Sequence, residues 1–215
     1  MSRKAYVLTL DSTSRRARHA KEIFDVVGME VVYCDVIKDE NRRVGHRKSM
    51  LEILKKVENS EEEWAYIFED DVQFYEYIGP PRLKKFEALS ENFYYLGCYS
   101  QSEPEKTDEV IDDEVPVYRI KKDFTRLSHA FGISKKGAKI LLDSCSEFPE
   151  VSFGFDELLW RVFYNESPIV VMGDYQSEQR DNEYGIAFQD RWEFSDNPNP
   201  QNDLEKPLFN LRLYE

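Results

Sequence analysis

Short apolar runs alternate along the first half of the chain with segments in which apolar residues recur every three or four positions. Uninterrupted apolar runs are typical of buried strands, and the longer spacing is typical of helices that pack one face on a core. Strands that alternate with helices in this way indicate an α/β fold, with a mostly parallel central sheet covered on both faces. The pattern predicts strands at residues 5–10, 31–35, 64–68 and 93–96, and helices at residues 15–28, 45–57 and 80–89.

The second half of the chain has a weaker pattern. The acidic stretch at residues 103–114 has two interpretations, a solvated loop, which we favour, or a flexible lid. From about residue 174 the chain is polar, and we predict no regular structure there. Between these segments the pattern predicts strands at residues 115–120, 130–133 and 169–172, and helices at residues 134–142 and 155–163.

The length of 215 residues and the mass of 25.5 kDa fit a single domain. No apolar run approaches the roughly 18 residues that span a bilayer. The first residues lack the apolar segment and cleavage site of a signal peptide. The three cysteines are widely spaced and include no Cys-x-x-Cys pair, which favours reduced thiols. We therefore expect a cytoplasmic protein.

Acidic residues outnumber basic ones by 42 to 29, so the net charge is −13. Duplex nucleic acid and anionic membrane surfaces both need a basic face, so we expect neither as a partner. An acidic chain can still bind an anionic small molecule when a metal ion lies between the two.

Three consecutive acids, Glu69, Asp70 and Asp71, directly follow the apolar run at residues 64–68. Ligands of parallel sheets bind beyond the carboxyl ends of the strands, so this position is informative. The three carboxylates repel one another and need a compensating cation, and oxygen ligands suit Mg²⁺ or Mn²⁺. The alternative is a strand end that is simply exposed to water.

Arginines gather at the start of the helix predicted at residues 15–28, with Arg15, Arg16 and Arg18 in its first turns. A helix N-terminus with arginines can hold a phosphate, although taken alone these arginines favour the interpretation as a solvated face. Because the acids and the arginines meet at one edge of the sheet, a metal-bound diphosphate is a ligand that would suit both.

Four elements, in order from about residue 5 to residue 175, resemble glycosyltransferase family 25, the lipopolysaccharide and collagen galactosyltransferase group. Members of this broad group also occur in large DNA viruses. The chain departs from the family pattern at Thr9, where the family has Asn, and at Ser49-Met50, where the family has Ser-His and this chain has its histidine at His46. The matching elements are Thr9-Leu10-Asp11 with Arg15 and Arg16, the Glu69-Asp70-Asp71 strand end, residues 131–142, and Asp156-Glu157.

The resemblance implies a GT-A-like, Rossmann-type α/β/α sandwich formed by residues 1–215 as one glycosyltransferase domain. Its nucleotide-binding half would cover residues 1–100, and its acceptor-side half residues 101–215. It implies transfer of a hexose from a UDP-sugar, UDP-glucose or UDP-galactose above all, to a hydroxyl of a glycan or glycoprotein acceptor. The cofactor implied is Mn²⁺ or Mg²⁺, and for a viral member the compartment would be the host cytoplasm.

The resemblance also implies roles for single residues. Asp71 would bind the metal with Glu69 as a further carboxylate, and Asp70 would contact the ribose. The nucleotide would be held by Thr9, Leu10, Asp11, Arg15 and Asp35. The base that deprotonates the acceptor hydroxyl would be Asp156 or Glu157, unless these two acids only favour the helix dipole.

Two other functions stay open. A Mg²⁺-dependent phosphohydrolase would use the same carboxylates, but its aspartyl-phosphate type needs Asp-x-Asp after the first strand, where this chain has only Asp11. A domain that binds sugar nucleotides or glycans without turnover is the second alternative.

Overall fold

The computed structural model describes residues 3–74, 78–100, 103–112, 115–120, 125–149, 153–163, 170–172 and 183–189. Its helices are α1 (Arg15–Val27), α2 (Arg42–Glu58), α3 (Pro80–Glu87), α4 (Lys135–Ser144) and α5 (Phe155–Phe163), with a 3₁₀ turn at Cys145–Glu147. Its strands are β1 (Arg3–Thr9), β2 (Met29–Asp35), β3 (Trp64–Glu69), β4 (Val72–Phe74), β5 (Phe93–Ser100), β6 (Glu105–Ile111), β7 (Val115–Arg119), β8 (Thr125–Ser134), β9 (Val170–Met172), β10 (Glu183–Gly185) and β11 (Ala187–Gln189).

Within these residues, nine strands form one sheet in the order β2-β1-β3-β8-β5-β9-β7-β6, with β10 paired to β5. Strands β1, β2 and β3 are parallel, β8 runs against both β3 and β5, and β9 is parallel to β5. Strand β7 runs against β9, and β6 runs against β7. Six strands therefore share one direction, and β7, β8 and β10 run opposite to them. The predicted α/β fold with a mostly parallel sheet is confirmed.

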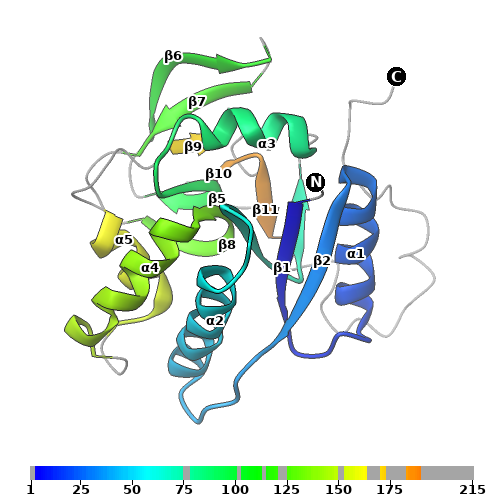
Figure 1. Cartoon of the computed structure of the whole chain (residues 1–215), viewed down its shortest axis with the longest axis vertical. Coiled ribbons are helices and arrows are strands. Elements are labelled where there is room, and N and C mark those ends of the chain that lie inside the picture. Colours follow the sequence, from blue (N-terminus) through cyan, green and yellow to red (C-terminus); the bar gives the residue numbers. More distant parts are fainter. Residues whose placement is uncertain are drawn as a thin grey trace.

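Helices cover both faces of the sheet, as Figure 1 shows. The side chains of each buried strand alternate between the two faces. In β1, Ala5 and Val7 pack with the buried residues of α1 and α3, whereas Tyr6 and Leu8 pack with those of α2, α4 and α5. The strand segments of the sequence are continuously apolar because both faces of the sheet are buried.

The helix ends follow local capping chemistry. The Ser14 hydroxyl accepts a hydrogen bond from the backbone of Ala17, and Gly28 ends α1 with a left-handed φ of 75°. The Asn41 side chain caps α2, so this helix begins at Arg42 rather than at the predicted residue 45. No helix in the described part of the chain is long and apolar enough to cross a membrane.

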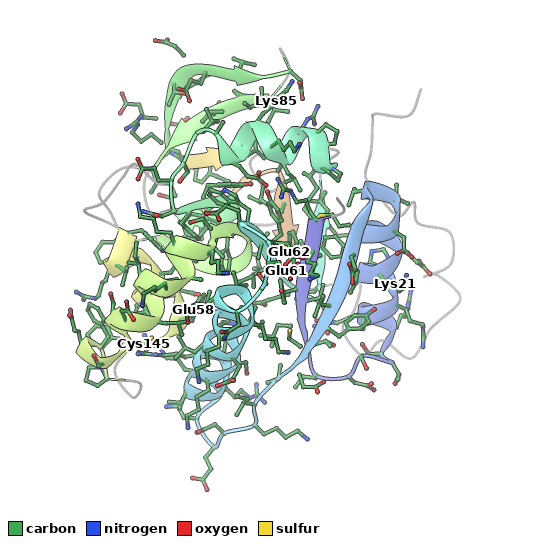
Figure 2. All side chains as sticks on the ribbon, viewed as in Figure 1. Lys21, Glu58, Glu61, Glu62, Lys85 and Cys145 are labelled. Atoms are coloured by element: carbon green, nitrogen blue, oxygen red, sulfur yellow. The ribbon has the colours of Figure 1, made fainter. Side chains whose placement is uncertain are left out.

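The loop predicted for the acidic stretch is wrong for residues 105–111, which form strand β6. This strand pairs antiparallel with β7 in a hairpin at the edge of the sheet, at the top of Figure 1. Most of its side chains are exposed, so the charges stay hydrated while the backbone pairs. Next to the hairpin, Arg82 and Lys85 of α3 form ion pairs with Asp112, and Figure 2 labels Lys85 at this place.

Two short strands near the end of the described chain pair with strands from its first half. Strand β10 pairs with β5, and β11 pairs with β4 in a separate two-stranded sheet. The backbones of Gly97 in β5 and Ala187 in β11 approach closely, because a Cβ atom at Gly97 would overlap the carbonyl of Ala187. The prediction of no regular structure from residue 174 is therefore wrong at residues 183–189, and the rest of that tail lies outside the described residues.

Candidate active site

The carboxyl ends of β1, β2 and β3 meet at one edge of the sheet. Thr9 lies opposite Asp35 in the register of β1 and β2, and Leu8 lies opposite Glu69 in that of β1 and β3. This edge is at the lower end of these strands in Figure 1, where the loops to α1 and α2 begin. The structure thus brings together Thr9, Asp35 and the acidic triplet, which are far apart in the sequence.

The three acids of the triplet do not gather on one point. Glu69 follows the alternation of β3 and lies on the side of α2, where its carboxylate is 3.3 Å from Nε2 of His46. Asp70 Oδ1 and Asp71 Oδ2 are instead each 3.8 Å from Nη1 of Arg16, which belongs to α1. The acids of the triplet are thereby divided between Arg16 on one face of the sheet and His46 on the other, which separates their charges.

Asp70 also receives a hydrogen bond from β1. The buried Thr9 hydroxyl donates a hydrogen bond of 2.6 Å to Asp70 Oδ2. Burial raises the pKa of Asp70, and the charge of Glu69 also raises it, while Thr9 and Arg16 lower it; the net shift is upward. A carboxyl group whose pKa is shifted by burial beside a specific charged partner is typical of functional sites.

The other predicted nucleotide ligands lie in the β1–α1 loop, at the start of α1 and at the end of β2. Asp11 Oδ1 accepts hydrogen bonds from the backbone and hydroxyl of Thr13, which lower the pKa of Asp11. Leu10 is exposed, with 75% of its surface accessible, and Arg15 and Asp35 are also exposed. The roles of these residues toward a nucleotide stay predictions.

The two predicted bases at the start of α5 differ in their surroundings. The Glu157 carboxylate accepts a hydrogen bond of 3.1 Å from the backbone N–H of Gly154, which closes the first turn of α5. It also forms an ion pair with Arg43 of α2. Glu157 is therefore held as a helix cap.

Asp156 lies in the neighbourhood of His46. The His46 ring packs edge-on against Phe155, with ring centroids 6.3 Å apart, and Phe155 directly precedes Asp156. Burial lowers the pKa of His46, but the Glu69 carboxylate and then the charge of Asp156 raise it by more, so the net shift is upward. Burial, and then the charges of Cys98 and Asp156, raise the pKa of Tyr95 on the fully buried part of β5.

Arg47 anchors the segment that leads into α5. Its guanidinium, buried with the whole residue 1% exposed, donates hydrogen bonds to three backbone carbonyls. The acceptors are Cys145 at 3.2 Å, Phe148 at 2.6 Å and Phe153 at 2.9 Å. Figure 2 labels Cys145 at the end of α4, beside α2. Helix α2 thus fixes the position from which α5 starts.

The sequence predictions missed His46, Arg43 and Arg47 as members of this edge. Of the arginines at the start of α1, they gave the nucleotide-binding role to Arg15, whereas the structure places Arg16 near Asp70 and Asp71. The sequence of the first two turns of α2 does contain a pattern that indicates these residues. Arg43 and Arg47 are four residues apart and His46 is three from Arg43, so all three share one helix face. Charged residues on a face that a helix turns toward the protein indicate a structural or functional role.

Among the described residues, no three side chains of the His, Cys, Asp or Glu type lie together as the ligands of a metal ion. That part of the chain therefore holds no metal cage built from protein ligands alone. Asp70 and Asp71, whose carboxylates converge on one nitrogen of Arg16, do offer the one or two carboxylates with which proteins bind Mg²⁺ together with substrate phosphates.

No family model matches the chain, and no curated protein matches it either. The resemblance to family 25 therefore stays a prediction.

The chain is similar to several solved structures. A glycosyltransferase involved in the glycosylation of the major capsid of PBCV-1 is 13% identical, with a TM-score of 0.43 over 77% of this chain and 76% of that one. The inositol-1-phosphate CTP transferase from T. maritima is 11% identical, with a TM-score of 0.42 over 83% and 91% of the two chains. The apo-form glycosyltransferase GlyE of Streptococcus pneumoniae TIGR4 is 12% identical, with a TM-score of 0.39 over 79% and 44%. We draw no conclusion about function from likenesses at this level.

Proposed function

We propose that the chain is a glycosyltransferase that moves a hexose from a UDP-sugar to a hydroxyl group of a glycan or of a protein-linked acceptor. The observation that carries this proposal is the division of the strand-end edge into two halves. One half holds Asp70, Asp71 and Arg16, which suit a diphosphate and its cation. The other half holds Glu69, His46 and, at the start of α5, Asp156, which suit proton transfer.

In this proposal Asp71 and Asp70 hold Mn²⁺ or Mg²⁺ jointly with the donor diphosphate. The ion would stabilise the negative charge that develops on the departing diphosphate. The Arg16 guanidinium, now 3.8 Å from both carboxylates, is placed to contact a diphosphate oxygen at the same point. Glu69 lies on the other sheet face, against His46, so we keep it with the second half of the site.

The acceptor hydroxyl needs a base when configuration is inverted. In that reaction the acceptor oxygen attacks the anomeric carbon and its proton passes to the base. The bond between the anomeric carbon and the diphosphate oxygen breaks, and UDP leaves with the bonding electrons. We assign the base to Asp156, because its charge acts on His46 at the strand-end edge, whereas Glu157 pairs with Arg43 and caps α5.

The phosphohydrolase alternative finds less support in the β1–α1 loop. Asp11, the acid that would have to form the phosphoenzyme, accepts two hydrogen bonds from Thr13 and shapes the turn into α1. A release of inorganic phosphate from simple phosphomonoesters would nevertheless favour that function over ours.

Donor binding is tested by titration calorimetry of UDP with and without Mn²⁺. We expect binding that needs the cation, and we expect Asp71→Ala to abolish the cation-dependent part. Asp143→Ala is the matched control, because Asp143 is an exposed acid of α4 whose ion pair with Lys139 lies within that helix. Unchanged cation-dependent affinity in Asp71→Ala would refute the assignment.

Turnover is tested by the release of UDP from a panel of UDP-sugars, first without and then with acceptor glycans. Slow hydrolysis without an acceptor, accelerated by one of the acceptors, is the result expected for a transferase. Asp156→Asn should leave the affinity for UDP within about twofold and should slow transfer by about 10²-fold or more. Tight binding of UDP-sugars with no turnover under any condition would instead support a binding domain.

A further inference from the structure

His46 lies at the junction of three elements that the site uses. It belongs to α2, its imidazole contacts the last residue of β3, and its ring packs against the first residue of α5. These elements come from residues 42–58, 64–69 and 155–163, so a single side chain bridges the early and the late part of the sheet edge.

The contact to β3 is polar. Nε2 of His46 is 3.3 Å from Glu69 Oε1, and the two side chains are 30% and 27% exposed. The pair is partly shielded from water, so a protonated imidazole at this place would attract Glu69 more strongly than in a surface ion pair. Glu69 in turn cannot swing toward Asp70 and Asp71 without leaving the face of the sheet that β3 assigns to it.

The contact to α5 is a packing contact that fixes where Asp156 lies. Phe155 is 1% exposed and stands edge-on to the imidazole with an interplanar angle of 77°. The Asp156 charge acts on both His46 and the fully buried Tyr95 of β5. These two side chains belong to α2 and β5, so the Asp156 charge acts on both of these elements.

Tyr95 provides a second, independent sign that this place receives a ligand. Its hydroxyl is buried and has no hydrogen-bond partner within the described part of the chain. Buried hydroxyl groups in folded proteins nearly always have a partner, which is often an ordered water or a ligand. A polar group that enters beside Asp156 would supply one.

We infer that His46 is a positioning residue, which ties the Asp156 carboxylate to Glu69 and holds it ready for the acceptor hydroxyl. This inference rests on the proposed function, because it assigns His46 to the acceptor half of the same site. The donor half, with Asp70, Asp71 and Arg16, lies on the other face and does not depend on His46.

The kinetic test compares two replacements of His46 in the full-length chain. His46→Phe keeps an aromatic ring against Phe155 but removes both nitrogens, and His46→Gln keeps an N–H group near the position of Nε2. We expect His46→Phe to lower kcat by about 10- to 100-fold with the KM for the UDP-sugar unchanged within twofold. His46→Gln should restore a substantial part of kcat. A full kcat in His46→Phe would overturn the inference while leaving the proposed function intact.

A second measurement needs no turnover. In a double-mutant cycle of urea denaturation, Glu69→Gln and Asp156→Asn should be coupled in the wild-type chain, with a midpoint that departs from additivity by about 0.3 M urea. The same cycle in the His46→Phe chain should be additive. Additive effects with His46 present would overturn the inference.

The two failures can be told apart. If the wild-type chain turns over no UDP-sugar, the proposed glycosyltransferase activity fails, and the denaturation cycle still decides whether His46 links the two carboxylates. If transfer is observed and the cycle is additive, only the inference about His46 fails. Asp143→Asn serves as the control in both assays, because Asp143 lies on α4 in an ion pair with Lys139.

Discussion

Replacement of Arg47 by methionine should cost a large part of the stability of the fold. Methionine keeps the apolar stem but removes the guanidinium, which leaves the carbonyls of Cys145, Phe148 and Phe153 without their donor. A hydrogen bond to a charged group contributes about 1.5–3 kcal/mol, and the three are not additive because they share one group. We therefore expect a loss of about 4 kcal/mol of the free energy of unfolding, against a usual total of about 5–15 kcal/mol.

Urea denaturation followed by circular dichroism measures this loss, and thermal denaturation should show a fall in Tm of about 8–16 °C for a chain of this size. Arg43→Met is the matched control, since Arg43 lies one turn earlier on α2 and its side chain is 49% exposed in its ion pair with Glu157. That variant should lose less than about 1 kcal/mol. If Arg47→Met is no less stable than Arg43→Met, the anchoring role of Arg47 is wrong.

Three further predictions concern single contacts. Gly97→Ala places a Cβ atom against the carbonyl of Ala187, so we expect the free energy of unfolding in urea to fall by about 1–3 kcal/mol. An unchanged value would contradict the close approach of these two backbones. Burial raises the pKa of Asp70, so its contribution to stability is complete below the ordinary value of 3.8 and is lost as pH rises through the folded-state pKa. Asp70→Asn should therefore raise Tm at pH 7 with little gain at pH 3.5, and a lower Tm at pH 7 would refute this. Tyr66→Phe removes the partly buried hydrogen bond of 2.7 Å to Glu87, which Arg3 still pairs, and the acceptor of the Tyr94 hydroxyl. We expect a cost of about 1–3 kcal/mol by urea denaturation, and an unchanged value would contradict this role of Tyr66.

The hydrophobic pattern was sufficient to predict the helices and the central strands. Ala5, Val7 and Phe68 face one layer of helices while Tyr6 and Leu8 face the other, and such two-sided burial produces the continuous apolar runs that the sequence displays. The rule that strand ends carry the site also predicted that Thr9, Asp35 and the triplet would gather, because parallel neighbours end at the same edge.

Other features depend on contacts that the pattern does not encode. The charged strand β6 exists because its backbone pairs with β7, a contribution that is independent of its side chains. Arg47 looks like a solvated residue in the sequence, and only the carbonyls of Cys145, Phe148 and Phe153, which lie around its guanidinium, make it a buried donor. Glu69 lies on one face of the sheet and Asp70 and Asp71 on the other because of the turn that follows β3. Three like-charged residues in a row do not predict this turn.

The pairing of β4 with β11 has a consequence for how the chain folds. Val72 and Phe74 are fully buried, yet the strand that pairs with them consists of residues 187–189. A ribosome must therefore synthesise more than a hundred further residues before the strand next to the acidic triplet can acquire its partner. Contacts of such long range slow the final step of folding, and a nascent chain would expose an incomplete strand-end edge until that step is complete.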